Sequence, residues 1–340
     1  MADLGHDQHP TALGPEQPAR PAGDTRDCRV AVVVLTYDRL SDTLACLDSL
    51  KHVDWRALSV IVVDNGSSDG TAEAVRARHP AVEVLAQERN LGFAEGNNVG
   101  IRHALDAGAD YVFLLNNDTT LAPDVVAECV AAARRNEDAG AVCPLICFAE
   151  PPTLIWYAGA DFDPRRARSG RMLGYRESDH GQFTAVAETD RVAGAAVLLS
   201  RAALERVGLL DGELFFLYED VDWSLRARRA GYRIYLAPRG KVSHRVSASA
   251  GGEHSPTIAY YDTRNHVVIC RRYAPLRGLG AFKREIAILL IHLAGARRAN
   301  RRWAYLGAAL RGWSDGRRGR LGPHAEHRRR TPGERPRAGV

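Results

Sequence analysis

The chain has 340 residues, of which 45% are hydrophobic and 26% are charged, and this balance is typical of a globular protein with one large core or two small ones. It excludes a chain that is disordered over most of its length. The net charge of +5 is unevenly distributed, since residues 271–340 carry 18 Arg and Lys against 4 Asp and Glu, while the rest of the chain is acidic. The two parts are therefore expected to meet different partners.

Both ends of the chain read as tails. Residues 1–27 and 323–340 are rich in Pro, Gly and polar residues without apolar periodicity, which predicts disorder. The first tail has no basic start followed by an apolar run, so we interpret it as not being a secretory signal and expect a cytoplasmic protein. The six cysteines are scattered, with no C-x-x-C pair and no zinc-like spacing, so we expect them to be reduced and buried.

From residue 29 onward, short apolar runs alternate with helix-like segments. We expect strands at 30–35, 60–63, 82–85 and 111–115, with helices between them at 40–50, 71–78 and 94–107. Right-handed βαβ units of this length predict an α/β fold with an open, mostly parallel sheet flanked by helices. Further along we expect helices at 124–136, 201–207 and 222–230, strands at 195–200 and 234–236, and β-hairpin pieces in a loop-rich region at 151–189.

Polar residues follow each expected strand, at the sheet edge where such folds bind their ligands. These segments are 36–39, 64–71, 90–98 and 116–119. In 64–71 (DNGSSDGT) and 90–98 (NLGFAEGNN), a loop that leads into a helix offers backbone N–H groups to a nucleotide or phosphate, and Asp64 could accept a hydrogen bond from a base or ribose. Each of these two segments alone is equally compatible with a turn and a helix cap.

The run Asn116-Asn117-Asp118 comes directly after the strand at 111–115. Asp118 can bind Mg²⁺ or Mn²⁺ with diphosphate oxygens completing the coordination, because a hard cation of this kind keeps few protein ligands. The alternative is a turn in which Asp118 caps the backbone. His244 follows the strand at 234–236 and could be the second protein ligand if the fold returns it to Asp118; otherwise it is a structural or surface residue.

Three carboxylates stand near the start of a predicted helix, in the run Glu219-Asp220-Val221-Asp222-Trp223. The positive end of the helix dipole favours ionised carboxylates there. Asp220, beside an apolar stretch, is the candidate general base that takes a proton from an attacking hydroxyl. We assign Glu219 and Trp223 to the acceptor side, and Asp222 to a structural ion pair with Arg226 at i, i+4 spacing.

Five segments, in this order over about residues 29–272, resemble the family 2 glycosyltransferases of the GT-A fold, particularly bacterial rhamnosyltransferase-like and galactofuranosyltransferase-like members. The segments are 33–39 (VVLTYDR), 63–71 (VDNGSSDGT), 89–101 (RNLGFAEGNNVGI), 114–119 (LLNNDT) and 218–226 (YEDVDWSLR). The resemblance implies an inverting enzyme that moves a sugar, with rhamnose as one candidate, from a nucleoside-diphosphate donor to a hydroxyl of a glycan or lipid-linked acceptor. A divalent cation, Mg²⁺ or Mn²⁺, would stabilise the departing nucleoside diphosphate.

The resemblance also implies roles for individual residues. Asp118 would bind the metal at the D-x-D position of the family, with His244 as a second ligand, and Asp220 would be the base. Asn116 replaces the first D-x-D carboxylate, which makes the metal depend more on the diphosphate and on His244, and Asp38 stands where many relatives have Asn. The donor-binding residues would be Thr36, Tyr37, Arg39, Asp64, Asn65, Asn90, Gly92, Asn97, Asn116 and Asn117.

We expect a GT-A domain at 28–272 and a helical, basic extension at 273–322. The apolar run at 286–291 is too short to span a bilayer. Aromatic and aliphatic residues interleaved with Arg over 282–320 predict an amphipathic helix on an anionic membrane surface, with the protein peripheral on the inner face of the plasma membrane. The alternative is a helix packed on the catalytic domain. Nucleic acid is not expected as a partner, because the acidic body would repel its phosphates.

Two other functions fit parts of this pattern. A catalytically inactive, membrane-tethered module that binds nucleotide sugars is one, and the presence of both Asp220 and His244 argues against it. A sugar nucleotidyltransferase shares the open sheet, but it should carry a Gly-rich loop with Arg and Lys after the first strand. The segment 36–39 contains no glycine.

Overall fold

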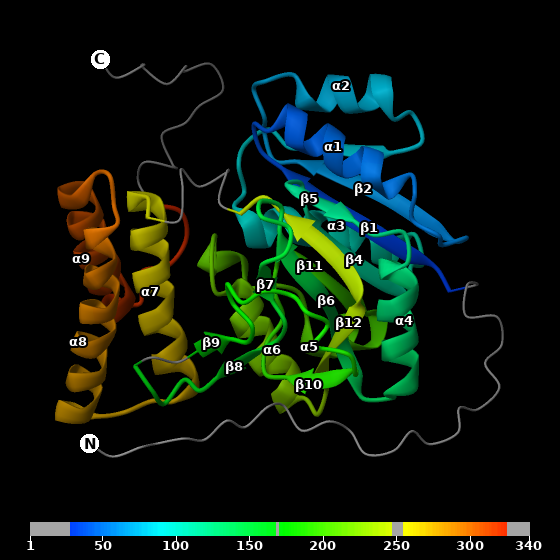
Figure 1. Cartoon of the computed structure of the whole chain (residues 1–340). Helices are drawn as coiled ribbons and strands as arrows, with labels where there is room; N and C mark the ends of the chain where they lie inside the picture. Colours follow the sequence, from blue (N-terminus) through cyan, green and yellow to red (C-terminus); the bar gives the residue numbers. More distant parts are fainter. Residues whose placement is uncertain (1–27, 168–169, 247–253, 325–340) are drawn as a thin grey trace.

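The computed structural model describes residues 28–167, 170–246 and 254–324 (Figure 1). The tail predicted at 1–27 lies outside the described residues, as does the tail predicted at 323–340 except for residues 323 and 324. All six cysteines are described; none forms a disulfide and all but the half-buried Cys28 are buried, as predicted.

The main sheet has the strand order β10-β12-β6-β11-β4-β1-β2-β3, with β5 added to β12 and β7 added to β6. The strands are β1 Val30–Thr36, β2 Leu58–Asp64, β3 Glu83–Ala86, β4 Tyr111–Asn116, β5 Thr119–Leu121, β6 Ala139–Phe148, β7 Ile155–Tyr157, β10 Ala187–Thr189, β11 Ala196–Ser200 and β12 Arg233–His244. Strands β8 Ala160–Phe162 and β9 Gly170–Met172 form a separate antiparallel pair.

The helices are α1 Leu40–Leu50, α2 Thr71–Arg78, α3 Phe93–Asp106, α4 Val125–Arg135, α5 Arg201–Val207, α6 Glu219–Arg229, α7 Pro256–Tyr273, α8 Gly278–Ala294 and α9 Arg302–Arg318. Two short 3₁₀ helices, Gly212–Leu214 and Gly295–Arg297, precede α6 and α9. The α/β order predicted for the first 115 residues is confirmed. Strand β1 is buried along its whole length and pairs in parallel with β2 and β4, as its continuous apolar sequence predicts.

The second half of the sheet is mixed. Strand β11 runs antiparallel to both β4 and β6, while β6 and β12 are parallel to each other. Strands β5 and β6 were not predicted, and β12 is much longer than the predicted 234–236. Pro144 interrupts the apolar pattern of β6, and Pro238 lies where the register of β12 shifts, so neither strand reads as one run in the sequence.

Helices α7, α8 and α9 stand side by side at one end of the molecule, on the left of Figure 1. Helix α9 packs closely on α7 through small residues: a Cβ at Gly312 would lie 2.3 Å from the carbonyl oxygen of Tyr260. Helix α7 begins at Pro256, so this helical layer of α7, α8 and α9, called the extension from here on, begins within the segment predicted as the catalytic domain. None of the helices described is both long enough and apolar enough to cross a membrane.

Candidate active site

The ends of three neighbouring strands bring the predicted donor residues to one edge of the sheet. Thr36, at the end of β1, pairs with Asp64 at the end of β2, and the preceding residue of β1 pairs with Asn116 at the end of β4. This is the edge at which the polar segments were expected, because parallel strands end on the same side of the sheet.

His244 returns to Asp118 through strand pairing. Strand β12 pairs antiparallel with β5, which places His244 opposite Thr119, next to Asp118. The Nε2 atom of His244 lies 3.1 Å from Oδ1 of Asp118, and both side chains are only 6% exposed. The ring of Trp156 packs edge-on against that of His244, with centroids 4.7 Å apart, and the Arg245 N–H donates to the Asp118 carbonyl at 2.9 Å.

The Asp118 and His244 side chains are the residues of this edge that could hold a metal ion. Among the described residues, Nδ1 of His244 is buried without a hydrogen-bond partner, and Oδ1 of Asp118 is buried with no partner besides its 3.1 Å contact with Nε2 of His244. A buried polar atom of this kind is costly unless a ligand satisfies it. A carboxylate oxygen and an imidazole nitrogen suit Mn²⁺ or Mg²⁺. No group of three or more His, Cys, Asp or Glu is placed to hold a metal in the described part of the chain, so a cation here would need oxygens from another molecule.

Several predicted donor-binding side chains instead make internal hydrogen bonds. The Asn117 amide donates to the hydroxyls of Thr36, at 3.2 Å, and of Thr43, at 3.0 Å. The Asn97 amide donates to the Phe93 carbonyl at 2.9 Å, and Asp64 accepts from the Ser67 N–H at 2.9 Å. These four predicted residues, Thr36, Asp64, Asn97 and Asn117, are all buried. Their side chains therefore shape the edge, while Tyr37, Arg39, Asn90 and Asn116 remain partly exposed.

Asn65 organises the loop that leads into α3. Its amide donates to the Gly92 carbonyl at 3.0 Å and to the Asn90 side chain at 3.1 Å, and its oxygen accepts from the Leu91 N–H at 2.9 Å. Gly92 has φ +87°, and a Cβ there would lie 2.5 Å from the Phe215 ring. Only glycine fits this backbone conformation and this space.

Asp38, which stands where the resemblance implies Asn in many relatives, connects the first two loops of the edge. Its carboxylate accepts from the Ser68 N–H at 2.6 Å, and its own N–H donates to the Ser67 hydroxyl at 3.0 Å. A carboxylate makes the first of these bonds stronger than a neutral amide oxygen would. The departure therefore ties the segment 36–39 to the segment 64–71.

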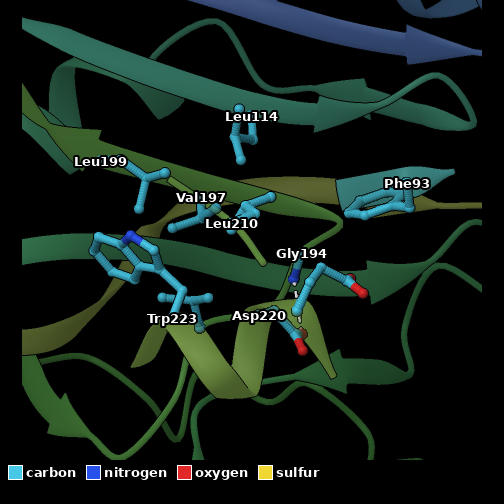
Figure 2. Close-up of a pocket in the computed structure, with 10 residues that line it drawn as sticks. Phe93, Leu114, Gly194, Val197, Leu199, Leu210, Asp220 and Trp223 are labelled. Atoms are coloured by element: carbon cyan, nitrogen blue, oxygen red, sulfur yellow. Dashed lines mark hydrogen bonds between the residues drawn. The ribbon is translucent and has the colours of Figure 1, made fainter. Parts of the chain in front are cut away.

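The second cluster lies at the start of α6, which begins three residues earlier than predicted, so that Glu219 and Asp220 are its first two residues. Oδ2 of Asp220 lies 3.3 Å from the Gly194 N–H and 3.6 Å from Nη1 of Arg191, and the side chain is 19% exposed. Figure 2 shows Asp220 beside Gly194 in a small pocket that is largely apolar, with Trp223 next to Leu199.

Glu219 and Trp223 are more deeply buried than residues that contact an acceptor directly would be. Glu219 is 5% exposed, and its Oε2 has no hydrogen-bond partner among the described residues. Burial, reinforced by the neighbouring charge of Asp220, raises the pKa of Glu219 well above its usual value. The Trp223 ring is completely buried and its indole N–H donates to the Gly208 carbonyl at 3.0 Å, so Trp223 packs the core behind Asp220.

Asp222 has the predicted structural role. Its carboxylate accepts from Nε of Arg226 at 2.8 Å, and also from Arg272 at 2.6 Å and Tyr273 at 2.7 Å. The last two residues belong to the end of α7, so Asp222 joins α6 to the helical extension.

Residues 31–205, just over half of the chain, match the family Glycosyl transferase family 2. An N-acetylglucosaminyl-diphospho-decaprenol L-rhamnosyltransferase of Mycobacterium tuberculosis is 30% identical over 72% of this chain and 87% of its own length. The chain belongs to glycosyltransferase family 2. A dTDP-rhamnosyl transferase of Shigella flexneri is 27% identical over 77% of this chain and 86% of its own. A galactofuranosyltransferase of Mycolicibacterium smegmatis is 28% identical over 59% and 66%.

Among solved structures, the mannosyltransferase PcManGT of Pyrobaculum calidifontis, in complex with GDP-Man and Mn²⁺, aligns with a TM-score of 0.54 at 21% identity. The alignment covers 89% of this chain and 86% of that one. At this identity the similarity shows the fold, which is GT-A. The predicted family and its rhamnosyl and galactofuranosyl branch are thus confirmed, and the protein is a glycosyltransferase.

Sequence reasoning missed two groups in this family 2 glycosyltransferase, Arg191 and the backbone N–H of Gly194. Both precede β11, whose first residue, Ala196, pairs with Leu115 near the end of β4. Because β11 is antiparallel to β4, its start lies at the ligand-binding edge. Predicting these two groups from the sequence requires the direction of β11, because they precede a strand whereas the other candidates follow one.

Proposed function

We propose that the protein is a metal-assisted, inverting glycosyltransferase that moves a sugar from a nucleoside-diphosphate donor to an acceptor hydroxyl, with Asp220 as the general base. The observation that carries the proposal is the contact between Asp118 and His244, two buried side chains far apart in sequence. Within the described part of the chain, Oδ1 of Asp118 and Nδ1 of His244 have no hydrogen-bond partner beyond this contact. Rhamnose carried by dTDP is the first donor to test, because relatives with these activities match most of the chain.

The Asp118 carboxylate and the His244 ring would hold the divalent cation. When bound, that ion would neutralise the charge that develops on the departing diphosphate. Asn116 and Asn117 add no negative charge beside Asp118, so the donor diphosphate would supply the remaining oxygen ligands. The network of Thr36, Thr43 and Asn117 keeps the turn that carries Asp118 rigid, which is what a precise site requires.

Asp220 would accept the proton of the acceptor hydroxyl as its oxygen attacks the anomeric carbon opposite the leaving group. The Gly194 N–H and the Arg191 guanidinium orient the carboxylate. Burial raises the pKa of Glu219, which disfavours a second negative charge beside Asp220. A single displacement of this geometry inverts the anomeric centre.

The acceptor would be a glycan or a lipid-linked sugar at an anionic membrane surface. The large hydrophobic side chains that are exposed in the described part of the chain all lie in the extension: Leu276, Leu279, Phe282, Leu290, Ile291, Trp303 and Leu310. Exposed basic residues lie among them, including Lys283, Arg298 and Arg302. A surface of this kind suits the interface of an anionic bilayer. This proposal places the protein on the inner face of the plasma membrane.

The Asp220→Asn substitution tests the proposal. With dTDP-rhamnose, Mn²⁺ and a polyprenyl-diphosphate-linked N-acetylglucosamine acceptor, we expect transfer to fall about 100-fold or more while nucleotide binding persists, because a general base contributes this much. Asp48→Asn, a half-exposed carboxylate on α1, is the control and should keep wild-type transfer. Wild-type transfer by Asp220→Asn would overturn the role of the base. Donor binding by the wild-type protein without transfer to any acceptor would favour the inactive module.

A further inference from the structure

The backbone directly before the proposed base is strained. Phe215, Leu217 and Tyr218 have φ values of +64°, +66° and +71°, in the left-handed region that residues with a side chain rarely adopt. The segment 215–218, here called the left-handed turn, leads directly into Glu219 and Asp220 at the start of α6. A strained segment of this kind persists when surrounding contacts over-determine it.

Helix α7 supplies those contacts through one buried amide. The side-chain nitrogen of Asn265 lies within hydrogen-bond distance of the carbonyl oxygens of Leu214, Phe216 and Leu217, at 3.1, 2.9 and 2.7 Å. Arg264 donates from Nη2 to the same Leu214 carbonyl at 2.7 Å, and from Nε to the Asn265 oxygen at 2.8 Å, which fixes the orientation of the amide. Both side chains are completely buried.

The left-handed turn connects these contacts with α7 to the proposed base, Asp220. The Tyr218 carbonyl accepts from the Asp222 N–H at 2.8 Å, which forms the first turn of α6 and sets where Asp220 stands. His266, the next residue of α7, stacks on the Tyr218 ring with centroids 5.4 Å apart. The extension therefore holds the start of α6 from one side, and Gly194 and Arg191 hold the Asp220 carboxylate from the other.

The loop at residues 90–92, which leads into α3 and is here called the donor-binding loop, is followed by a residue that contacts the same turn. Hydrogen bonds from Asn65 also hold this loop. The Phe93 N–H donates to the Phe215 carbonyl at 2.6 Å. The loop is also held by Asn65, which bonds to Leu91 and Gly92 independently of α7. Loss of the Asn265 amide would thus displace the base more than the donor-binding loop.

We propose that Asn265 is a positioning residue for Asp220, acting through the left-handed turn, so that the extension completes the active site. This inference rests on the proposed function of Asp220. It assigns the helical layer a part in catalysis that is separate from any contact with a membrane. The chemical step would be sensitive to Asn265 because a displacement of about 1 Å in a catalytic group can lower a rate about 100-fold.

The test compares Asn265→Ala with Thr263→Val in the full-length enzyme. Thr263 is buried on the same helix, donates to the Ala259 carbonyl at 2.7 Å, and makes no hydrogen bond to the turn. We expect Asn265→Ala to lower kcat 10- to 100-fold with less than a threefold change in the Kd for dTDP and Mn²⁺, and Thr263→Val to change kcat less than threefold. Equal losses of kcat in the two variants, or a parallel loss of dTDP binding, would overturn the inference.

A double-mutant cycle separates positioning from general destabilisation. If Asn265 acts through Asp220, adding Asn265→Ala to Asp220→Asn should lower the residual rate less than threefold, whereas fully additive losses would contradict the inference. Should Asn265→Ala not fold, Asn265→Ser, which keeps one hydroxyl donor, serves in its place. A fully active Asp220→Asn would refute the proposed base itself. An inactive Asp220→Asn together with a fully active Asn265 variant would refute this inference alone.

Discussion

Glu219 and Asp220 are neighbours in sequence with opposite environments. Asp220 lines the pocket, and its carboxylate lies beside the Arg191 guanidinium and the Gly194 N–H. Glu219 points into the protein, where its Oε2 finds no hydrogen-bond donor among the described residues. The two adjacent carboxyl groups therefore differ in environment, and burial raises the pKa of Glu219.

The raised pKa of Glu219 predicts how stability depends on pH. The stability that protonated Glu219 contributes is fully present below the pKa that Glu has in the unfolded chain. It is lost as pH rises through the higher pKa of Glu219 in the folded protein, because ionising a buried carboxyl is unfavourable. The loss has a maximum slope of about 1.4 kcal/mol per pH unit. Glu219→Gln should flatten the decline of the unfolding free energy as pH rises above 4.5, the usual pKa of Glu, measured by urea unfolding. Glu213→Gln, at an exposed site, is the control; parallel curves for wild type and Glu219→Gln would contradict the prediction.

At this scale the sequence identified which residues to examine better than it indicated where they point. Asp118, His244 and Asp220 could be singled out because each follows a strand or begins a helix at the ligand-binding edge. The inward orientation of Asn117 could not be predicted, since it depends on Thr43, a residue of α1 that is far away in sequence. The burial of Trp223 depends likewise on the Gly208 carbonyl.

Among the elements, β12 has the largest effect on the site. The local apolar pattern predicted only its first part, 234–236, because Pro238 and a register shift divide it. Its last residues pair with β5, and neither this pairing nor β5 has a signal in local periodicity. The alternating strands and helices up to β4 follow local rules and were predicted, whereas the position of His244 depends on a long-range pairing.

The pairing of β12 with β5 allows a test of the metal site. His244→Ala should weaken the binding of dTDP in the presence of Mn²⁺ about 10- to 100-fold, since the cation would lose one of two protein ligands, and should leave the weaker Mn²⁺-free binding unchanged. Isothermal titration calorimetry with and without Mn²⁺ measures both. Ser243→Ala, the preceding residue of β12, is the control and should bind like wild type. Equal Mn²⁺ dependence in His244→Ala and wild type would exclude His244 as a ligand.

At the scale of the whole molecule, the basic extension has an inner side that packs on the catalytic domain and an outer side that is exposed. Its inner side joins the catalytic domain through Asn265 and through the Asp222–Arg272 pair. Its outer side carries the exposed hydrophobic and basic residues. The two alternatives that the sequence left open, packing on the domain and binding an anionic surface, are therefore compatible. A chain ended near Arg272 could not test membrane binding, because it would also expose the face of α7 that α9 covers.

Point substitutions on the outer side provide the test. Arg298→Ser with Arg302→Ser should weaken binding to vesicles containing phosphatidylserine roughly 30-fold at low salt, since each basic residue near such a surface contributes about 1 kcal/mol. Trp303→Ser, at a side chain that is 82% exposed, should also weaken vesicle binding. Added salt should weaken the vesicle binding of the wild-type protein. The control, Arg76→Ser with Arg135→Ser, removes the same charge from exposed sites on the catalytic domain and should bind like wild type. Vesicle sedimentation measures all four proteins, and equal losses in the two Arg pairs would mean that net charge, rather than the extension, determines the attachment.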